Sequence, residues 1–264
     1  MIDLLMTAAL AAAAPTAQPA PSATADSPAM FVVRDADTTI YIFGTFHALD
    51  GHSEWFSNRV KSAFESSNEL VLETVIPEGP VQIHSSLKPR PLPVTPSASF
   101  LATTRLAINA GRSQGMQVAN GADNVLRHAA EAEGKPVEGL ETLELQLNMF
   151  TRMPVASASP KTGQPVDDGA TMDGLSKAMA AMQVAWKRGD QSVFVGMLNQ
   201  LEQSSPDTYR VMFTERNARW ADWIAGRMQT PGTVFIAVGA GHLAGKDSVL
   251  VRLAEQGITS ARLN

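Results

Sequence analysis

The chain has 264 residues, enough for one sizeable domain with a buried core or at most two small ones. Hydrophobic residues make up 44% and charged residues 18%, a balance typical of globular rather than disordered proteins. The formal net charge is -5 without a Lys/Arg cluster, so we expect no nucleic-acid partner. The absence of cysteine excludes disulfides, thiolate metal sites and a cysteine nucleophile.

The N-terminal residues predict an exported protein. Leu4 to Ala14 form an apolar run of signal-peptide length, too short to span a bilayer, and a Pro/Ala/Ser-rich stretch follows. The run lacks the usual basic residues before it, since Asp3 is the only charged residue there. We predict a signal peptide and flexible linker in residues 1–29, a domain in residues 30–264, a periplasmic or secreted location, and no membrane span in the mature chain.

The first half of the domain predicts strands alternating with a helix. Residues 31–43 are typical of a β-hairpin, and residues 54–67 have large apolar side chains every four positions, as in an amphipathic helix. Residues 68–77 then predict a third strand, ended by a proline. This order indicates a βαβ unit, with two parallel strands joined by a crossover helix.

The second half is predicted to be mostly helical as far as residue 230. Residues 77–102 are Pro-rich and irregular, too long for a simple connection, and so indicate a surface loop with a role or a lid. Asp123 is the predicted N-cap of a helix that ends near Gly134. The remaining predicted elements are a strand at 136–140, helices at 141–150, 172–190, 213–228 and 246–256, a strand at 233–238 and a short segment at 258–263. This pattern predicts a single α/β domain with a central, mainly parallel (mixed) sheet flanked by helices.

Two predicted strands end in the same pattern, a glycine followed three residues later by a histidine. The first, in "YIFGTFH", gives Gly44 and His47, and the second, in "FIAVGAGH", gives Gly239 and His242. Glycine permits a tight turn or a close backbone approach, and ligands of open α/β sheets bind beyond the carboxyl ends of the strands. If the two strands are adjacent, both imidazoles face one crevice. Glu73 ends the apolar run of the third strand at the matching place.

Two histidines and a carboxylate are a suitable donor set for zinc, manganese or cobalt. Such an ion lowers the pKa of bound water and polarises a carbonyl, which is the chemistry of a hydrolase. We therefore predict that His47, Glu73 and His242 are metal ligands and catalytic residues. The spacing alone also permits the alternative that each histidine is a capping or core residue, and the compact HExxH motif is absent.

Two further residues are candidates for assisting the reaction. Arg216 lies beside Asn217 on a predicted helix. In a functional role it would stabilise an oxyanion or bind a substrate carboxylate. The structural alternative is that it pairs with an acid at a helix end. Glu141 would accept a hydrogen bond from a ligand histidine or act as a general base. The structural alternative is an acid at the start of a helix, where the helix dipole favours it. No serine lies in a GxSxG elbow, which argues against a serine hydrolase.

The other histidines and the methionines are weaker candidates for the site. His52 would supplement the site, or else is an exposed loop histidine, and His84 and His128 are predicted to face solvent. The methionines of the helical part are predicted to pack in the core rather than to bind copper: Met172, Met179 and Met182.

Six segments in order resemble the TraB/GumN family: "YIFGTFHALD", "LVLETVIP", "GADNVLRHAAEAEGKPVEGLETLELQL", "WKRGD", "ERNARWADWI" and "VFIAVGAGHLAGKDSVLVRLAEQGI". That family is related to the Tiki proteases and, more distantly, to erythromycin esterases and ChaN-like proteins. The resemblance implies an α/β fold with a metal centre around Gly44, His47, Glu73, Gly239 and His242. The chain departs from the family pattern in its short, Pro-rich segment after Glu73, and we expect no Tiki-like membrane anchor.

The leading hypothesis is a metal-dependent hydrolase, peptidase-like or esterase-like, with a peptide or small-molecule substrate. Glu141 or Arg216 would assist an ion held by the three predicted ligands, and the donor set suits manganese, cobalt or zinc. The alternative is a non-catalytic protein that binds a ligand, a metal or haem in the same crevice. A third possibility, a purely structural interaction protein, requires the two histidines to lie far apart.

Overall fold

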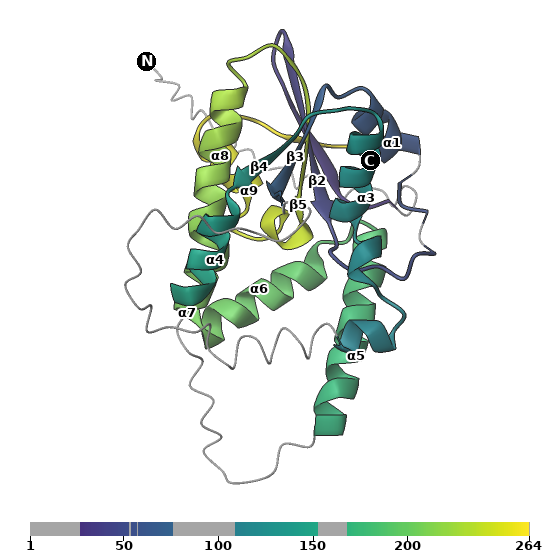
Figure 1. The fold of residues 1–264 in the computed structure, drawn as a ribbon. Helices are drawn as coiled ribbons and strands as arrows, with labels where there is room; N and C mark the ends of the chain where they lie inside the picture. Colours follow the sequence, from purple (N-terminus) through teal and green to yellow (C-terminus); the bar gives the residue numbers. More distant parts are fainter. Residues whose placement is uncertain (1–26, 53, 57, 76–108, 153–167, 264) are drawn as a thin grey trace, which may run out of the picture.

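The computed structural model describes residues 27–52, 54–56, 58–75, 109–152 and 168–263. A six-stranded sheet with the order β4-β3-β5-β2-β1-β6 forms its centre (Figure 1). The strands are β1 (Met30–Arg34), β2 (Thr38–Thr45), β3 (Glu69–Thr74), β4 (Val137–Glu141), β5 (Gly232–Gly239) and β6 (Ala261–Leu263). Strands β2 to β5 are parallel, and β1 is antiparallel to both of its neighbours, which confirms the predicted mixed, mainly parallel sheet.

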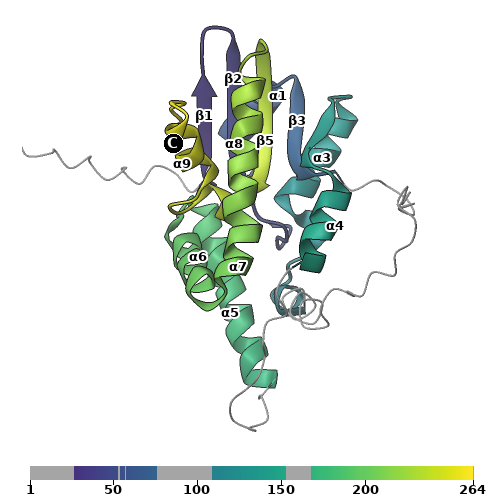
Figure 2. The same cartoon turned by 90° about the vertical axis from the view of Figure 1, so that its left-hand side faces the viewer.

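Helices cover both faces of the sheet. Strands β2 and β5 send alternate side chains, such as Ile42 and Ile236, into a core beneath α8 (Glu215–Arg227) and α9 (Val249–Glu255). Their other side chains, such as Phe43 and Phe235, pack in a second core with residues of α1 (Asn58–Glu65) and α3 (Ala122–Ala132). Figure 2 shows α8 and α9 on one side of the sheet. Burial on both faces explains why these strands are apolar throughout.

The βαβ prediction is correct in that its two strands are parallel, but these strands are not neighbours in the sheet. The hairpin of β1 and β2 forms, and β2 and β3 are parallel, but β5 lies between them and pairs with both. A local sequence pattern cannot show this insertion, because β5 comes about 160 residues later in the chain. Helix α1 begins at Asn58 rather than at the predicted residue 54, and Asn58 has a φ of 42°.

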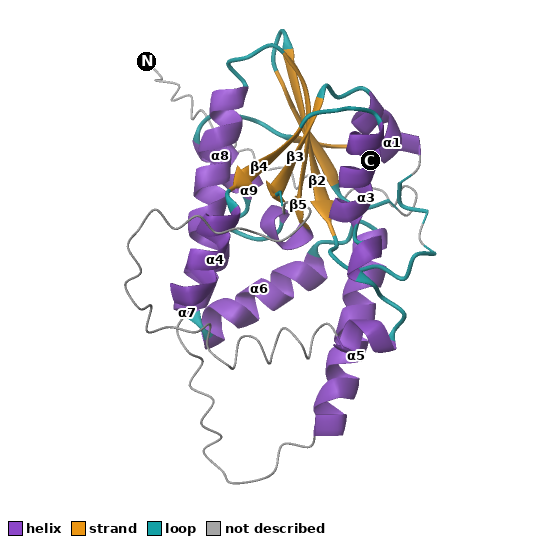
Figure 3. Cartoon of the chain, viewed as in Figure 1, coloured by secondary structure: helices purple, strands orange, loops and turns teal. Residues whose placement is uncertain are grey.

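The remaining helices gather beyond the carboxyl ends of the parallel strands, below the sheet in Figure 3. They are α4 (Leu143–Arg152), α5 (Asp168–Lys187), α6 (Ser192–Ser204) and α7 (Pro206–Tyr209), the last of which continues through the π-helical turn η2 (Arg210–Thr214) into α8. Residues 109–113 are also helical, and two short 3-10 helices, η1 (Val118–Asn120) and η3 (Ala240–Leu243), complete the described elements. No helix in the described ranges combines the length and apolarity needed to cross a membrane.

Several predicted features fall outside the described residues. These are residues 1–26 of the predicted signal peptide and linker, the Pro-rich segment 77–102, and His84 within that segment.

Candidate functional site

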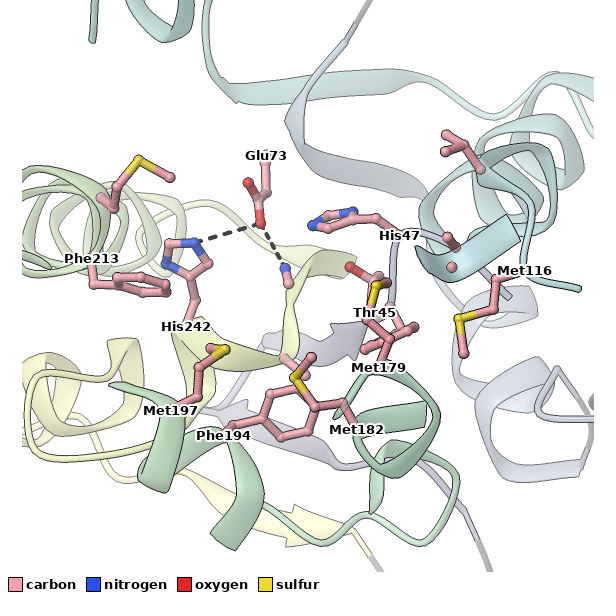
Figure 4. A pocket seen from close by; sticks show the side chains of 18 of the residues that line it. Thr45, His47, Glu73, Met116, Met179, Met182, Phe194, Met197, Phe213 and His242 are labelled. Atoms are coloured by element: carbon pink, nitrogen blue, oxygen red, sulfur yellow. Dashed lines mark hydrogen bonds and ion pairs between the residues drawn. The ribbon is translucent and has the colours of Figure 1, made fainter. Parts of the chain in front are cut away.

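The two glycine-histidine patterns meet because β2 and β5 are parallel neighbours. Gly44 is paired with Val238, and Thr45 is paired with Gly239, so both strands end at the same edge of the sheet. His47 and His242 consequently line one cavity of about 530 Å³ together with Glu73 (Figure 4), and Arg216 also belongs to its lining. A purely structural interaction protein would require these two histidines to lie far apart, and they do not.

Each motif glycine makes room for a close approach. A Cβ on Gly239 would lie 3.1 Å from both Glu73 Oε1 and His47 Nε2, so glycine leaves open the space on which the site side chains converge. The backbone N–H of Gly239 also donates to Glu73 Oε1 over 2.7 Å. A Cβ on Gly44 would lie 3.2 Å from the Cα of Ala240, so this glycine lets the two strand-end turns pack closely.

His242 is buried in η3 and held at both ring nitrogens. Its Nδ1 lies 2.6 Å from Asn217 Oδ1, and its Nε2 lies 3.2 Å from Arg216 Nη1. The Asn217 Nδ2 donates to the carbonyl of Asp247 over 2.7 Å, which orients the amide so that Oδ1 faces the ring. Since arginine only donates, Nε2 is the acceptor and Nδ1 carries the proton. Burial, reinforced by the Arg216 charge and opposed by Glu73, lowers the pKa of His242 to about 3.

Glu73, at the end of β3, is a carboxylate in this environment. Its burial disfavours the charged form, but the imidazoles of His242 and His47 and the Arg216 guanidinium outweigh that effect. They lower the pKa of Glu73 to about 2. Its Oε1 lies 3.8 Å from His242 Nε2, and its Oε2 accepts from Arg216 Nη2 over 2.8 Å.

Arg216 lines the cavity and pairs with two acids, which lie at the ends of strands β3 and β4 rather than at a helix end. Its side chain is 3% exposed and bonds Glu73 through Nη2 and Glu141 through Nε, at 3.0 and 3.1 Å to the two oxygens of Glu141. Glu141 is the last residue of β4 and not a helix-start acid, and it also accepts from Arg219 over 3.2 Å. Glu141 contacts Arg216 rather than a histidine, so it orients the guanidinium.

His47 has a more open environment than His242. Its side chain is 60% exposed, and its Nδ1 lies 3.4 Å from Asp123 Oδ1. Desolvation in the pocket wall lowers the pKa, but Asp123 and Glu73 outweigh it and raise the pKa of His47 to about 9. The prediction of Asp123 as an N-cap is wrong: Gly121 caps α3, and Asp123 lies in its first turn and faces His47.

The donor atoms fit a divalent ion by type. Two imidazole nitrogens and a carboxylate oxygen converge beside Gly239, in the space that a Cβ there would fill. Within the described ranges, no three His, Asp or Glu side chains are already grouped closely enough to enclose an ion. Arg216 accounts for part of this, because it donates to both Glu73 and His242. An ion bound to His242 Nε2 would replace the bond from Arg216 Nη1.

Apolar side chains form most of the cavity wall. Met179 and Met182 were predicted to pack in the core, but both are only partly buried and line the cavity. Helix α5 extends beyond the sheet (Figure 1), and these two methionines line the cavity, whereas Trp186 near the end of the same helix packs in the core. The wall also contains five residues for which the sequence predicts no role in a site: Met116, Phe194, Met197, Met212 and Phe213. Helical spacing identifies such residues as apolar, but it does not distinguish a core from a cavity.

The other predicted histidines do not join the site. His52 lies in an exposed loop, and His128 is exposed on α3, where its Nδ1 lies 3.4 Å from Glu131 Oε2. Neither lines the cavity. Asn217 and Asp123 contact the site histidines, and a sequence signal existed only for Asn217, which adjoins Arg216.

Comparison with known proteins identifies related sequences. The protein YbaP of Escherichia coli (strain K12), described as uncharacterized, is 29% identical over 137 residues, which cover 51% of this chain and 48% of YbaP. The YbaP protein of Shigella flexneri matches with the same identity and coverage. The match thus spans about half the length of these curated relatives. No solved structure gives a significant match.

A family model covers nearly the whole domain. The model of the TraB/PrgY/gumN family matches residues 29–88 and 84–262, a range that includes both glycine-histidine turns, Glu73 and Arg216. The chain therefore belongs to the TraB/PrgY/gumN family.

Proposed function

We propose that the protein is a metal-dependent hydrolase, esterase-like or peptidase-like, in which His47, Glu73 and His242 hold a divalent ion such as manganese, cobalt or zinc. One observation carries the proposal: these three side chains converge beside Gly239 at one end of a largely apolar cavity. A site that combines a few polar groups with an apolar cavity wall is typical of a small-molecule or enzyme site.

The ion would supply Lewis acidity, lowering the pKa of bound water and polarising a carbonyl of the substrate. The protein's own side chains orient the donors. Asn217 keeps the proton of His242 on Nδ1 and thereby leaves Nε2 as the atom that accepts. Glu141 holds the Arg216 guanidinium against Glu73, which keeps a positive charge beside the reacting centre.

The substrate is proposed to be a peptide or small molecule that the protein meets after export. The apolar run near the N-terminus supports a periplasmic or secreted location. Identification of the mature N-terminus by mass spectrometry, on protein recovered from a periplasmic fraction, tests this part independently of activity.

Metal content of the purified protein tests the proposed centre. Chelator-treated protein is incubated separately with manganese, cobalt and zinc, desalted and assayed for bound metal by mass spectrometry. We expect one ion per chain, and loss of that ion in His47→Ala, Glu73→Gln and His242→Ala. Loaded protein is then assayed for hydrolysis of model esters and peptides.

His128→Ala is the matched control, because His128 is an exposed histidine outside the cavity. This variant should keep the ion. If the wild type binds none of the three metals, or if His128→Ala loses the ion as the site variants do, the proposed centre is wrong.

A specific observation favours a second function, retention of a ligand without turnover. Glu73 and His242 are already bonded by Arg216, and the rest of the cavity is mostly apolar, so the pocket can hold a ligand or haem without any ion. Binding of haem or an apolar dye with no hydrolysis by metal-loaded protein would support this alternative.

A further inference from the structure

The cavity has two chemically distinct parts. One end carries the charged and imidazole groups described above. The rest of the lining is largely apolar and comes from α5, α6 and η2. We call this part the methionine wall and define it by its residues: Met179 and Met182 of α5, Phe194 and Met197 of α6, and Met212 and Phe213 of η2. Figure 4 labels all of these side chains except Met212, and Phe213 lies against the ring of His242, with ring centroids 4.8 Å apart. A ligand that fills the whole cavity must therefore combine a polar group with an apolar group.

The methionine wall suits a flexible aliphatic chain. Methionine side chains are unbranched and polarisable, so they adapt to chains without a fixed shape. Met197 is 38% exposed, and Val118, which also lines the cavity, is 52% exposed. The apolar surface thus continues outward, which gives an aliphatic chain a path into the cavity.

Thr45 brings a buried hydroxyl to the cavity lining. It is the last residue of β2, is 2% exposed and lines the cavity beside Gly239, its partner in the sheet. Its Oγ1 is buried without a hydrogen-bond partner among the described residues. A buried hydroxyl without a partner is costly, so this atom is suited to bond a ligand.

We propose that the cavity binds a molecule with an unbranched aliphatic chain next to an ester or amide carbonyl. The chain lies on the methionine wall, and Thr45 donates a hydrogen bond to the carbonyl oxygen. That such a molecule is a substrate rests on the proposed hydrolase function. The substrate class would then be esters or amides of medium-length acyl chains. Binding itself requires neither an ion nor turnover.

Non-hydrolysable ketones test the substrate class separately from catalysis. Chelator-treated protein is titrated calorimetrically with 2-butanone, 2-hexanone, 2-octanone and 2-decanone, which present a carbonyl beside chains of increasing length. The affinity should rise about three- to fourfold per buried methylene and level off when the cavity is full. Absence of binding to 2-octanone and 2-decanone would overturn the proposal, even if the metal centre is confirmed.

Variants of the methionine wall separate specific from nonspecific binding. The double variant Met179→Gln/Met182→Gln should lose most of the dependence on chain length, whereas Met179→Leu/Met182→Leu should retain it. Both positions are partly buried, so both variants are expected to fold, as checked by circular dichroism. Met172→Gln is the control, because Met172 lies on the same helix but not in the cavity wall, and it should match the wild type.

Thr45→Val tests the polar contact with a residue of similar shape. This variant should weaken all the ketones by about five- to tenfold without changing the dependence on chain length. If Met179→Gln/Met182→Gln does not change the dependence of affinity on ketone length, the aliphatic chain does not lie on the methionine wall and the proposal is overturned. Unchanged ketone binding in Thr45→Val would overturn the assigned carbonyl contact.

Discussion

The two strand-end turns contain the same glycine-histidine pattern, yet they produce different histidines. His47 has a side chain that is 60% exposed and pairs with Asp123 at the cavity edge. His242 has a side chain that is 7% exposed and is held by Asn217 and Arg216. The pKa is accordingly raised to about 9 for His47 and lowered to about 3 for His242. The motif determines where each ring lies, and the neighbouring elements determine its protonation.

The difference also distinguishes a rigid half of the site from an accessible half. His242, Glu73 and Arg216 are mutually bonded or paired below the surface, with Glu141 as a further support. His47 reaches the same space from an exposed turn with one ion-pair partner. Substitutions should therefore affect stability far more on the β5 side than on the β2 side.

The largest effect is expected when the buried half loses its cation. Arg216→Ala leaves the carboxylates of Glu73 and Glu141 buried without this guanidinium, which should cost about 3–5 kcal/mol of unfolding free energy, measured by urea denaturation. Arg219→Ala is the control, because Arg219 is 46% exposed and also contacts Glu141, and it should cost about 1 kcal/mol or less. Equal losses in the two variants would contradict the buried network.

A direct comparison of the two histidines should give the next largest difference. His242→Ala removes the ring that pairs with the buried Asn217 Oδ1, at an expected cost of about 1–3 kcal/mol. At pH 10, where the imidazole of His47 is neutral and its ion pair is lost, His47→Ala should lie within about 0.5 kcal/mol of the wild type, because it then removes only an exposed side chain. Thermal unfolding of metal-free protein measures both, and a larger loss in His47→Ala would refute the proposed division of the site.

Changing the support of His242 should make it more like His47. In Asn217→Asp, a carboxylate would face Nδ1 and raise the pKa of His242, because a neighbouring negative charge favours the imidazolium. Nitrogen NMR of the imidazoles in metal-free protein follows this change and identifies the Nδ1–H tautomer in the wild type. A wild-type ring protonated on Nε2 instead would be incompatible with the bond from Arg216.

The smallest effect is expected when His47 loses its acid. Asp123→Asn should move the pKa of His47 down from about 9 towards its ordinary value of 6.5, as measured by proton NMR titration of metal-free protein. The wild-type pKa is raised by folding, so the stabilisation is present below pH 6.5 and is lost as the pH rises through about 9. The variant should lack most of this pH-dependent loss.

Glu131→Gln provides the control for that experiment. Glu131 pairs with His128 on the exposed side of α3, so its substitution should leave the His47 titration unchanged. A His47 titration that shifts equally in both variants would indicate a general electrostatic effect rather than the pair with Asp123.

Several features of the fold and the site could be predicted from the sequence. Uninterrupted apolar runs identified β2 and β5 because both of their faces are buried, and Gly44 and Gly239 marked where the backbones approach other groups. His47, Glu73 and His242 were placed together because parallel strands end at one edge of a sheet. These inferences depend on periodicity and chain direction, which are local properties.

Only the tertiary structure decided how those residues interact. The insertion of β5 between β2 and β3, the pairing of Arg216 with Glu141 and of His47 with Asp123, and the arrangement of the methionine wall all join segments far apart in the chain. A local pattern identifies an apolar helix side or a charged residue but does not specify its partner. The protonation of the two histidines depends on those partners, because burial and nearby charges set a pKa.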